Sequence, residues 1–323
     1  MYWRIRQFAA VAGISLLDII RQPGFLLISA FGMGLITLLP LLLTQTLGES
    51  ARLVRDNGLA VHWTFGLLLG SYAASSTLAR ETALGTAALV LSKPVSRSLF
   101  FLAKFAGAAA ATLLFSLGAG MATLLSARMA AGYFVLDWRA GAPALAAPVL
   151  AFLIAGILNY RDRGPFVSRA FSWMLILYAA ALAWACAIDP EGHRCAFGAA
   201  MDWRLAPAGL LIAVALLMLT GLAGLLATRL DTVPTLILCS LAFLLGLVSD
   251  HLFGRAPHPS AAAAVLGGLV PNWQHFWLAD ALSGDGRIPW AYVGHASAYG
   301  ALHLGGLLLL GLLSFRSAEW RNG

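Results

Sequence analysis

Charged residues are scarce in this chain of 323 residues. Only 11% of the residues are charged, whereas 60% are hydrophobic, and the mean hydropathy is +0.82. A soluble domain carries charge at roughly twice that frequency, so the composition excludes an ordinary soluble protein. The phosphate-binding loop G-x-x-x-x-G-K-[ST] is also missing, because no glycine is followed by lysine. We therefore expect this chain to be no ATPase and to hold neither catalytic residues nor a cofactor of its own.

Cysteine is equally rare. The three cysteines are too few for a disulfide framework, and no C-x-x-C spacing indicates a metal or redox site. Cys186 and Cys195 lie close in sequence near the predicted outer end of one apolar run, where they could form a bridge if that side is oxidising. Cys239 lies in the middle of another apolar run, and we expect it to be inert.

The apolar residues gather into runs of about 18 residues or more, the length that a helix needs to cross a hydrocarbon core of roughly 30 Å. Backbone polar groups inside a bilayer must be satisfied within the spanning element, so these runs predict α-helices. We predict an all-α, polytopic membrane protein with one transmembrane domain over residues 1–323. About eight transmembrane helices are expected, at Phe25–Leu47, Val61–Leu78, Phe105–Ser126, Ala144–Leu158, Phe171–Ile188, Leu205–Ala227, Val233–Phe253 and Trp290–Phe315. The fourth is short for a full crossing and could be re-entrant.

The distribution of charge predicts the orientation. With the N-terminus in the cytoplasm, most of the 21 basic residues fall inside and most of the 14 acidic residues fall outside, as the positive-inside rule requires. Both termini are then cytoplasmic, and we expect a multi-pass protein of the bacterial cytoplasmic membrane. The basic residues are spread over several inside segments, so the pI of about 9.8 gives no reason to expect nucleic acid as a partner.

Residues 1–24, in front of the first predicted span, are apolar but striped. Charged and polar residues interrupt them, so they do not read as a cleavable signal peptide. At helical spacing, the polar residues and the apolar residues fall on different sides of the predicted helix. The polar side carries Arg4, Gln7, Ser15, Asp18 and Gln22, and the apolar side carries Ile5, Phe8, Ala12, Leu16 and Ile19. Pro23 and Gly24 end the segment. Such an amphipathic helix suits the membrane interface, either as an elbow helix that leads into the first span or as a surface anchor.

Residues 79–104, between the second and third predicted spans, read as two helices joined by a sharp turn. Residues Glu81–Leu91 predict a short helix, and Ser92-Lys93-Pro94 predicts a turn, because the residue before proline avoids the helical region. Ser96 predicts the cap of a second helix that begins at Arg97 and runs into the third span. A rigid hairpin of this kind, unlike a flexible loop, can pass force to a partner.

This hairpin resembles the corresponding region of ABC-2-type permeases, which include the permeases encoded with the nitrous-oxide-reductase maturation system. The resemblance lies in the pattern Glu81…Gly85-Thr86…Leu91-Ser92-Lys93-Pro94-Val95-Ser96-Arg97…Lys104…Gly107. Residues 227–233, 247–253 and 270–294 are similar to late parts of a subgroup of that family. Together these stretches cover the first three and the last three spans. The family usually has six spans, so the resemblance implies that residues 144–188 form an extra hairpin.

The resemblance also implies a division of labour. A separate ATPase subunit would bind ATP and Mg, residues 79–104 would act as its coupling segment, and two permease chains, identical or different, would form the path of an exporter. The residues assigned to coupling are Arg80, Glu81, Gly85, Thr86, Lys93, Pro94 and Arg97. Alternatively, these residues only set the orientation and form the turn, which is the interpretation we favour for Lys104. The substrate is not identified by the sequence.

The outer half of the predicted topology carries the features behind a second hypothesis. All seven histidines fall there, at His62, His193, His251, His258, His275, His295 and His303. They leave open a metal or haem site, and with it a membrane-embedded enzyme, although no close pair has metal-ligand spacing. A membrane scaffold without transport is the third hypothesis.

Residues 254–289 are too polar to span, and we expect short helices there at the outer surface, with Trp273, Trp277, Trp290 and Tyr292 in an aromatic belt.

The predicted spans themselves contain little polar chemistry. We expect no buried acid or base in them, which argues against a carrier driven by an intramembrane carboxylate relay. Gly66-x-x-x-Gly70 allows another helix to approach closely, a weak indication of a dimer seam.

Overall fold

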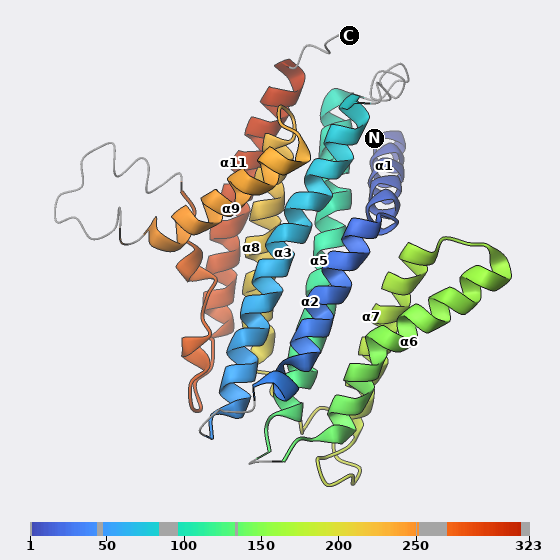
Figure 1. Ribbon diagram of the computed structural model, residues 1–323. Coiled ribbons are helices and arrows are strands. Elements are labelled where there is room, and N and C mark those ends of the chain that lie inside the picture. The colour runs from blue at the N-terminus through green and yellow to red at the C-terminus, as the bar shows by residue number, and fades with distance from the viewer. Residues whose placement is uncertain are drawn as a thin grey trace.

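The computed structural model describes residues 2–43, 48–83, 96–132, 135–249, 251 and 270–317 (Figure 1). This part of the chain is helical, apart from an isolated β-bridge between Ile188 and Arg194. Its α-helices are α1 (Tyr2–Ile20), α2 (Pro23–Leu42), α3 (Ser50–Ala83), α5 (Arg97–Met129), α6 (Trp138–Asp162), α7 (Phe166–Ala187), α8 (Leu205–Leu226), α9 (Thr232–Ser249) and α11 (Trp290–Ser317). The 3-10 helices η2 (Trp273–His275) and η3 (Asp280–Leu282) precede α11. The predicted all-α fold is confirmed for these residues.

Seven of the described helices, namely α2, α5, α6, α7, α8, α9 and α11, are long and apolar enough to cross a membrane. The chain is therefore a multi-pass membrane protein. The fourth predicted span lies within α6, whose 25 residues extend about 37 Å at 1.5 Å per residue and so exceed the hydrocarbon thickness. By length, α6 needs no re-entrant path.

The second predicted span, Val61–Leu78, lies within α3, which is not among these seven. Serine, threonine and histidine residues lower its hydropathy. They are accommodated because α3 packs against α2, α5, α8 and α9 and has neighbours on most sides. The Ser75 and Thr77 hydroxyls donate to the Ser71 and Ala73 carbonyl oxygens one turn earlier, at 2.7 and 3.2 Å. A helix inside the bundle can thus be more polar than one that faces lipid. That α3 crosses the membrane stays a prediction.

The close approach of α3 and α8 depends on the two glycines of the Gly66-x-x-x-Gly70 motif. A Cβ atom added at Gly66 would collide with Leu216 of α8, and one added at Gly70 would lie 2.5 Å from the Thr220 hydroxyl oxygen. Thr220 in turn shares a hydrogen bond of 3.3 Å with Thr112 of α5. The motif therefore joins three helices of one chain, and its interpretation as a dimer seam is wrong.

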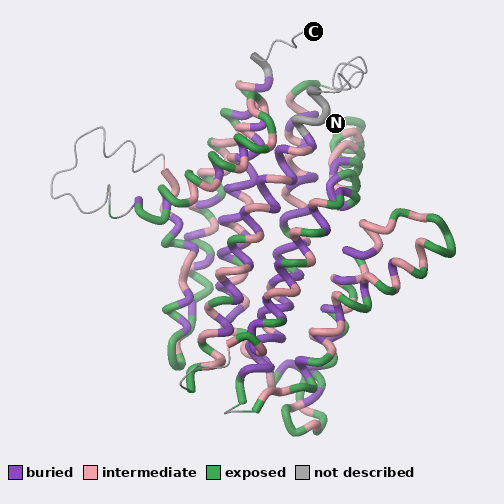
Figure 2. The backbone as a smooth tube through the Cα atoms, viewed as in Figure 1, coloured by how far each residue is buried: buried purple, intermediate pink, exposed green. Residues whose placement is uncertain are grey.

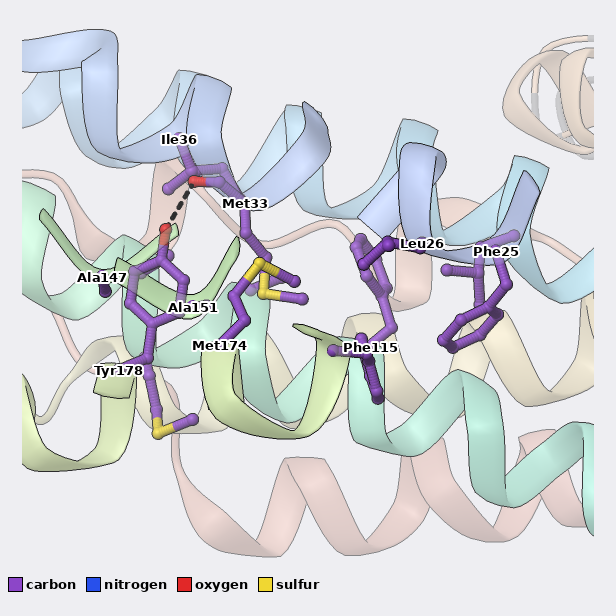
Figure 3. Close-up of a cluster of buried hydrophobic side chains, with 14 of the residues drawn as sticks. Phe25, Leu26, Met33, Ile36, Phe115, Ala147, Ala151, Met174 and Tyr178 are labelled. Atoms are coloured by element: carbon purple, nitrogen blue, oxygen red, sulfur yellow. Dashed lines mark hydrogen bonds between the residues drawn. The ribbon is translucent and has the colours of Figure 1, made fainter. Parts of the chain in front are cut away.

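A cluster of buried hydrophobic side chains joins α2 and α5 to the α6–α7 pair (Figure 3). Phe25 of α2 packs edge-on against Phe171 of α7, with ring centroids 4.9 Å apart. The Tyr178 hydroxyl donates to the Met33 carbonyl oxygen at 3.3 Å. A stripe of buried alanines on α6 lets α7 approach closely, at Ala140, Ala144, Ala147, Ala151 and Ala155. Helices α6 and α7 thus form a hairpin where one was predicted; its status as an addition to a six-span family stays a prediction.

Helix α1 packs lengthwise beside α5 in Figure 1. A Cβ atom at Gly107 of α5 would lie 2.6 Å from the Ser15 Cβ and 2.9 Å from the Ala12 carbonyl oxygen. Ser15, predicted on the polar side of α1, is fully buried, whereas Ile5 on the predicted apolar side is 58% exposed. The assignment of the two sides is therefore wrong at these positions, because small residues, and not large apolar ones, fit closest to α5. The role of α1 as an interfacial elbow stays a prediction.

The two ends of the bundle are named here after the predicted topology. The inner end carries Ala83 and Arg97, and the outer end carries Ser50, Met129 and Leu205. Figure 1 places the start of α1 and the end of α11 at the inner end. Burial is concentrated in the middle of the bundle, and outward faces are exposed (Figure 2). The exposed faces of α9 and α11 are rich in leucine, as expected for surfaces in contact with a lipid bilayer.

Candidate functional site

The predicted coupling residues lie at or next to the inner end. Arg80 and Glu81 belong to the last turns of α3, where the structure describes the backbone alone. Gly85, Thr86, Lys93 and Pro94 lie outside the described residues. Arg97 is the first residue of α5.

The start of α5 agrees with the sequence. Ser96 has an extended backbone with φ −69° and ψ 142°, and its hydroxyl accepts a hydrogen bond from the Leu99 amide at 3.3 Å. This is the geometry of an N-cap, and it satisfies one of the amides that a helix start leaves without an intrahelical partner. The predicted cap and the predicted start at Arg97 are confirmed. Glu81, in contrast, does not begin a new helix, because α3 runs without interruption from Ser50 to Ala83.

The first turns of α5 are anchored by aromatic packing. Phe100 and Phe101 are buried against Phe315 of α11, with ring centroids 6.2 and 5.7 Å apart. Lys104 is also buried, and its ammonium lies 5.6 Å from the centre of the Phe100 ring. A buried lysine held against a ring serves the packing of α5. This position is consistent with the favoured interpretation of Lys104, which gave it no part in coupling.

The outer end holds a buried ion pair that sequence reasoning missed. The Arg128 Nε donates to an Asp137 carboxylate oxygen at 3.1 Å, with both side chains almost fully buried. Arg128 also donates to the carbonyl oxygens of Ala185 and Ile188, at 2.7 Å for Ile188. Asp137 accepts the Arg139 amide at 3.0 Å and so caps α6. One arginine therefore ties together the ends of α5 and α7 and the start of α6.

A polar cavity of about 360 Å³ lies beside this pair. Its lining includes four arginines and one carboxylate, namely Arg52, Arg55, Arg128, Arg204 and Asp202. Asp202 accepts two hydrogen bonds from the Arg204 guanidinium, at 2.7 and 3.0 Å. Burial raises the pKa of Asp202, but these bonds and the positive charge outweigh it and hold the pKa below its ordinary value. Asp202 is therefore a carboxylate already bound by its own neighbour.

Arg55 is the exceptional member of the lining. Its side chain is 8% exposed. Its Nε donates to Asp56 at 3.0 Å, and its Nη1 donates to the Leu282 carbonyl oxygen at 2.8 Å. Its Nη2 is buried and has no hydrogen-bond partner among the described residues. A buried charged donor without an acceptor is costly, so this atom marks a place where an acceptor is missing.

An apolar groove, also of about 360 Å³, lies between α3, α5, α7 and α8. Its lining includes Leu59 of α3, Leu124 of α5, Leu182 of α7 and Gly209 of α8. Ser116, a further lining residue, is hydrogen-bonded to the His62 Nε2 at 2.7 Å. His62 is fully buried within a predicted span, so the expectation that the spans hold no buried base is wrong at this residue.

Of the remaining histidines, His275 and His303 pack against the same Tyr299 ring, with ring centroids 5.4 and 4.4 Å apart. His193 is exposed beside Asp189, and His258 lies outside the described residues. Within the described ranges no group of three histidine, cysteine or acidic side chains is placed to hold a metal. The described geometry therefore gives the metal and haem hypothesis no support.

The outer segment before α11 is more buried than predicted. Trp273 of η2 is 1% exposed, and its ring lies 6.5 Å from Trp63 of α3 and 6.3 Å from Phe243 of α9. Gly246 of α9 lets it approach, since a Cβ there would collide with its indole. Trp273 is therefore a core residue, and its assignment to an aromatic belt is wrong. Trp290, at 64% exposure, lies at the surface.

Cys186 and Cys195 are neighbours with free thiols in the structure. The Cys195 Sγ lies 3.8 Å from the Cys186 carbonyl oxygen. Backbone hydrogen bonds from Cys195 to Ala187 and from Gly198 to Cys186 hold the loop in place. The bridge between them stays a prediction, which a count of free thiols in non-reduced protein tests.

No family model, no curated protein and no solved structure matches this chain. The similarity to ABC-2-type permeases therefore depends only on the residues quoted above. What the geometry itself offers is a capped helix start at the inner end, and a polar cavity and an apolar groove at the outer end.

Proposed function

We propose that this chain is the membrane-spanning permease subunit of an ABC-2-type transporter in a bacterial cytoplasmic membrane. It works as an exporter, together with a second permease chain. A separate ATPase subunit binds ATP and Mg and drives transport through residues 79–104. The alternatives are a membrane-embedded enzyme that uses outer histidines and a scaffold without transport, and no described contact favours either.

The observation that carries this proposal is the pattern from Glu81 to Arg97 together with the two helices that flank it. These helices, α3 and α5, are the longest described ones, with 34 and 33 residues. At 1.5 Å per residue each extends about 50 Å, well beyond a hydrocarbon core of roughly 30 Å. Both pack against each other and against α8. A displacement at their inner ends would therefore be transmitted along rigid helices into the centre of the bundle.

The charge of the flanking residues supports a contact with another protein. Arg97 is exposed at the start of α5. The Ser96 cap restricts the backbone just before it, and the turn predicted at Pro94 would restrict it further. A basic turn of this kind would suit an acidic groove on a partner.

The test is co-purification. We would express this chain with the ATPase encoded beside its gene, purify through a tag on this chain, and measure bound ATPase and ATP hydrolysis in nanodiscs. We expect Glu81→Ala and Arg97→Glu each to reduce the bound ATPase about tenfold or more, since a buried charged contact at an interface contributes 2–5 kcal/mol. Arg161→Glu is the matched control, because Arg161 is an arginine at 82% exposure outside the coupling segment.

Two results would contradict the proposal. If no ATPase associates with the wild-type chain, the permease assignment is wrong. If Arg97→Glu and Arg161→Glu weaken the association equally, residues 79–104 are not the contact.

A further inference from the structure

We propose that the polar cavity and the apolar groove at the outer end together hold one anionic lipid, with a phosphate-bearing headgroup in the cavity and an acyl chain in the groove. This site does not depend on the ATPase, so it stands or falls separately from the proposed function. Three features point to it: a buried arginine nitrogen without an acceptor, the charge balance of the cavity wall, and the neighbouring linings of the two spaces.

The headgroup position is marked by Arg55. Two of its three guanidinium nitrogens have protein acceptors, Asp56 and the Leu282 carbonyl oxygen. The third, Nη2, is buried without a partner, and Arg55 lines the cavity. Arginine binds phosphate well because its planar donors match phosphate oxygens and form charge-assisted hydrogen bonds. A phosphate in the cavity would meet the Arg55 guanidinium, which would turn its Nη2 toward the phosphate to gain the missing acceptor.

The other charges near the cavity are already paired. Arg128 is satisfied by Asp137 and two carbonyl oxygens, and Arg204 by Asp202 and the Gly284 carbonyl oxygen. Arg52 bridges Glu49 and Asp56 at 3.2 and 3.7 Å. Of the four carboxylates in these pairs, only Asp202 lines the cavity, whereas all four arginines do. The wall facing an occupant is therefore basic, although the surrounding group of side chains is balanced.

Neighbouring residues line the groove and the cavity on three segments. On α3, Arg55 lines the cavity and Leu59, one turn later, lines the groove. On α5, Leu124 lines the groove and Arg128, one turn later, lines the cavity. Between α7 and α8, Arg204 lines the cavity and Leu205 lines the groove. Polar and apolar spaces therefore lie end to end, in the order in which a lipid presents its headgroup and its chain.

The chain offers a variant for each half of the site. Arg55→Gln removes the charge at the headgroup, and Arg287→Gln is its control, since Arg287 is exposed in the outer segment and does not line the cavity. Gly209→Leu fills the groove, because a Cβ at Gly209 meets nothing within 4 Å. Gly156→Leu is its control, for Gly156 of α6 has the same free space and lies away from the groove.

The experiment counts and titrates bound lipid by native mass spectrometry on the full chain in neutral detergent. The probes are phosphatidylglycerol, phosphatidylcholine with the same acyl chains, and inorganic phosphate. We expect one bound phosphatidylglycerol, with a preference over phosphatidylcholine of about tenfold, as a charge-assisted hydrogen bond provides. Arg55→Gln should abolish the preference for phosphatidylglycerol, and Gly209→Leu should weaken the binding of both lipids. The two control variants should bind as the wild type does.

Two outcomes would overturn the proposal. Equal binding of the two lipids by the wild type would mean that water satisfies Arg55. Binding of inorganic phosphate that depends on Arg55, together with lipid binding that Gly209→Leu leaves unchanged, would assign the cavity to a free anion. Because Gly209→Leu does not touch the buried arginine, it tests the proposal even if Arg55→Gln does not fold.

Discussion

Two exposed arginines away from the outer end differ from two buried arginines at the outer end in how their charge is held, and Lys104 shows that the inner end buries a charge as well. Away from the outer end, Arg97 and Arg161 are exposed, and Arg161 lies 3.9 Å from the neighbouring carboxylate of Asp162. At the outer end, Arg128 and Arg55 are buried and bound by groups that come from distant parts of the chain. Exposed charge orients a membrane protein and meets partners, whereas buried charge fixes the positions of the segments that pair with it.

This difference explains why a count of charges is informative for one end only. Inside, basic residues exceed acidic ones, and the excess itself predicts the orientation. Outside, arginines and carboxylates nearly cancel in number, so the sequence suggests an unremarkable surface. The pairing of Arg128 with Asp137 and of Arg204 with Asp202 shows that the same balance comes from specific contacts.

The largest effect is expected from breaking the buried pair at the outer end. Arg128→Ala leaves Asp137 buried without its counter-charge and frees two carbonyl oxygens, so we expect a loss of about 3–5 kcal/mol in the free energy of unfolding. Thermal unfolding in detergent measures it. Arg161→Ala, at an exposed arginine, should change stability by no more than about 0.5 kcal/mol. Equal unfolding temperatures for the two variants would contradict the described contacts of Arg128.

A smaller effect is expected where α1 meets α5. Gly107→Leu forces a side chain into the backbone of α1 at Ala12 and Leu16, and overpacking of this kind costs about 1–3 kcal/mol. Gly120→Leu is the matched control on the same helix, because a Cβ at Gly120 meets nothing within 4 Å. If α1 lay on the membrane surface away from α5, the two variants would unfold alike.

The smallest effect is expected at the cap of α5. Ser96→Ala removes the acceptor of the Leu99 amide, which should cost about 1 kcal/mol. Ser96→Asp keeps an acceptor at this position and should restore stability. A drop in ATPase association with Ser96→Ala, reversed by Ser96→Asp, would extend the comparison from stability to coupling. Loss of stability in both variants would show that the hydroxyl acts in some way other than as a cap.

Much of the fold follows from local signals in the sequence. Long apolar runs predicted the helices, and the serine before Arg97 predicted a cap that the structure has. The positions of Gly66 and Gly70 indicated a close helix contact, but not that the partner was α8 of the same chain, since sequence spacing does not specify which helix fills a groove. The two sides of α1 were assigned by hydrophobicity alone. That assignment is wrong at Ser15, because close packing of two helices favours small side chains at their contact.

The outer site lay beyond sequence reasoning for a different reason. Its residues come from five segments, around residues 51–59, 113–131, 182, 199–213 and 282. Each arginine alone reads as an ordinary loop or helix-end charge, and no short motif joins them. A weak signal existed in Arg55 and Leu59, one helical turn apart at the start of a span, but only the fold shows that Arg128 and Leu124 mirror them on α5. Gly85, Thr86, Lys93 and Pro94 remain predictions from sequence.

The claim that the two ends face opposite sides of the membrane can be tested most directly by cysteine labelling. In a chain with Cys186, Cys195 and Cys239 replaced by serine, we would introduce Arg97→Cys or His193→Cys, both at exposed positions. A membrane-impermeant maleimide would then be added to intact spheroplasts and to opened membranes. We expect His193→Cys to react in both samples and Arg97→Cys to react only in opened membranes. Labelling of Arg97→Cys in intact spheroplasts would place the coupling segment outside the cell and contradict the account.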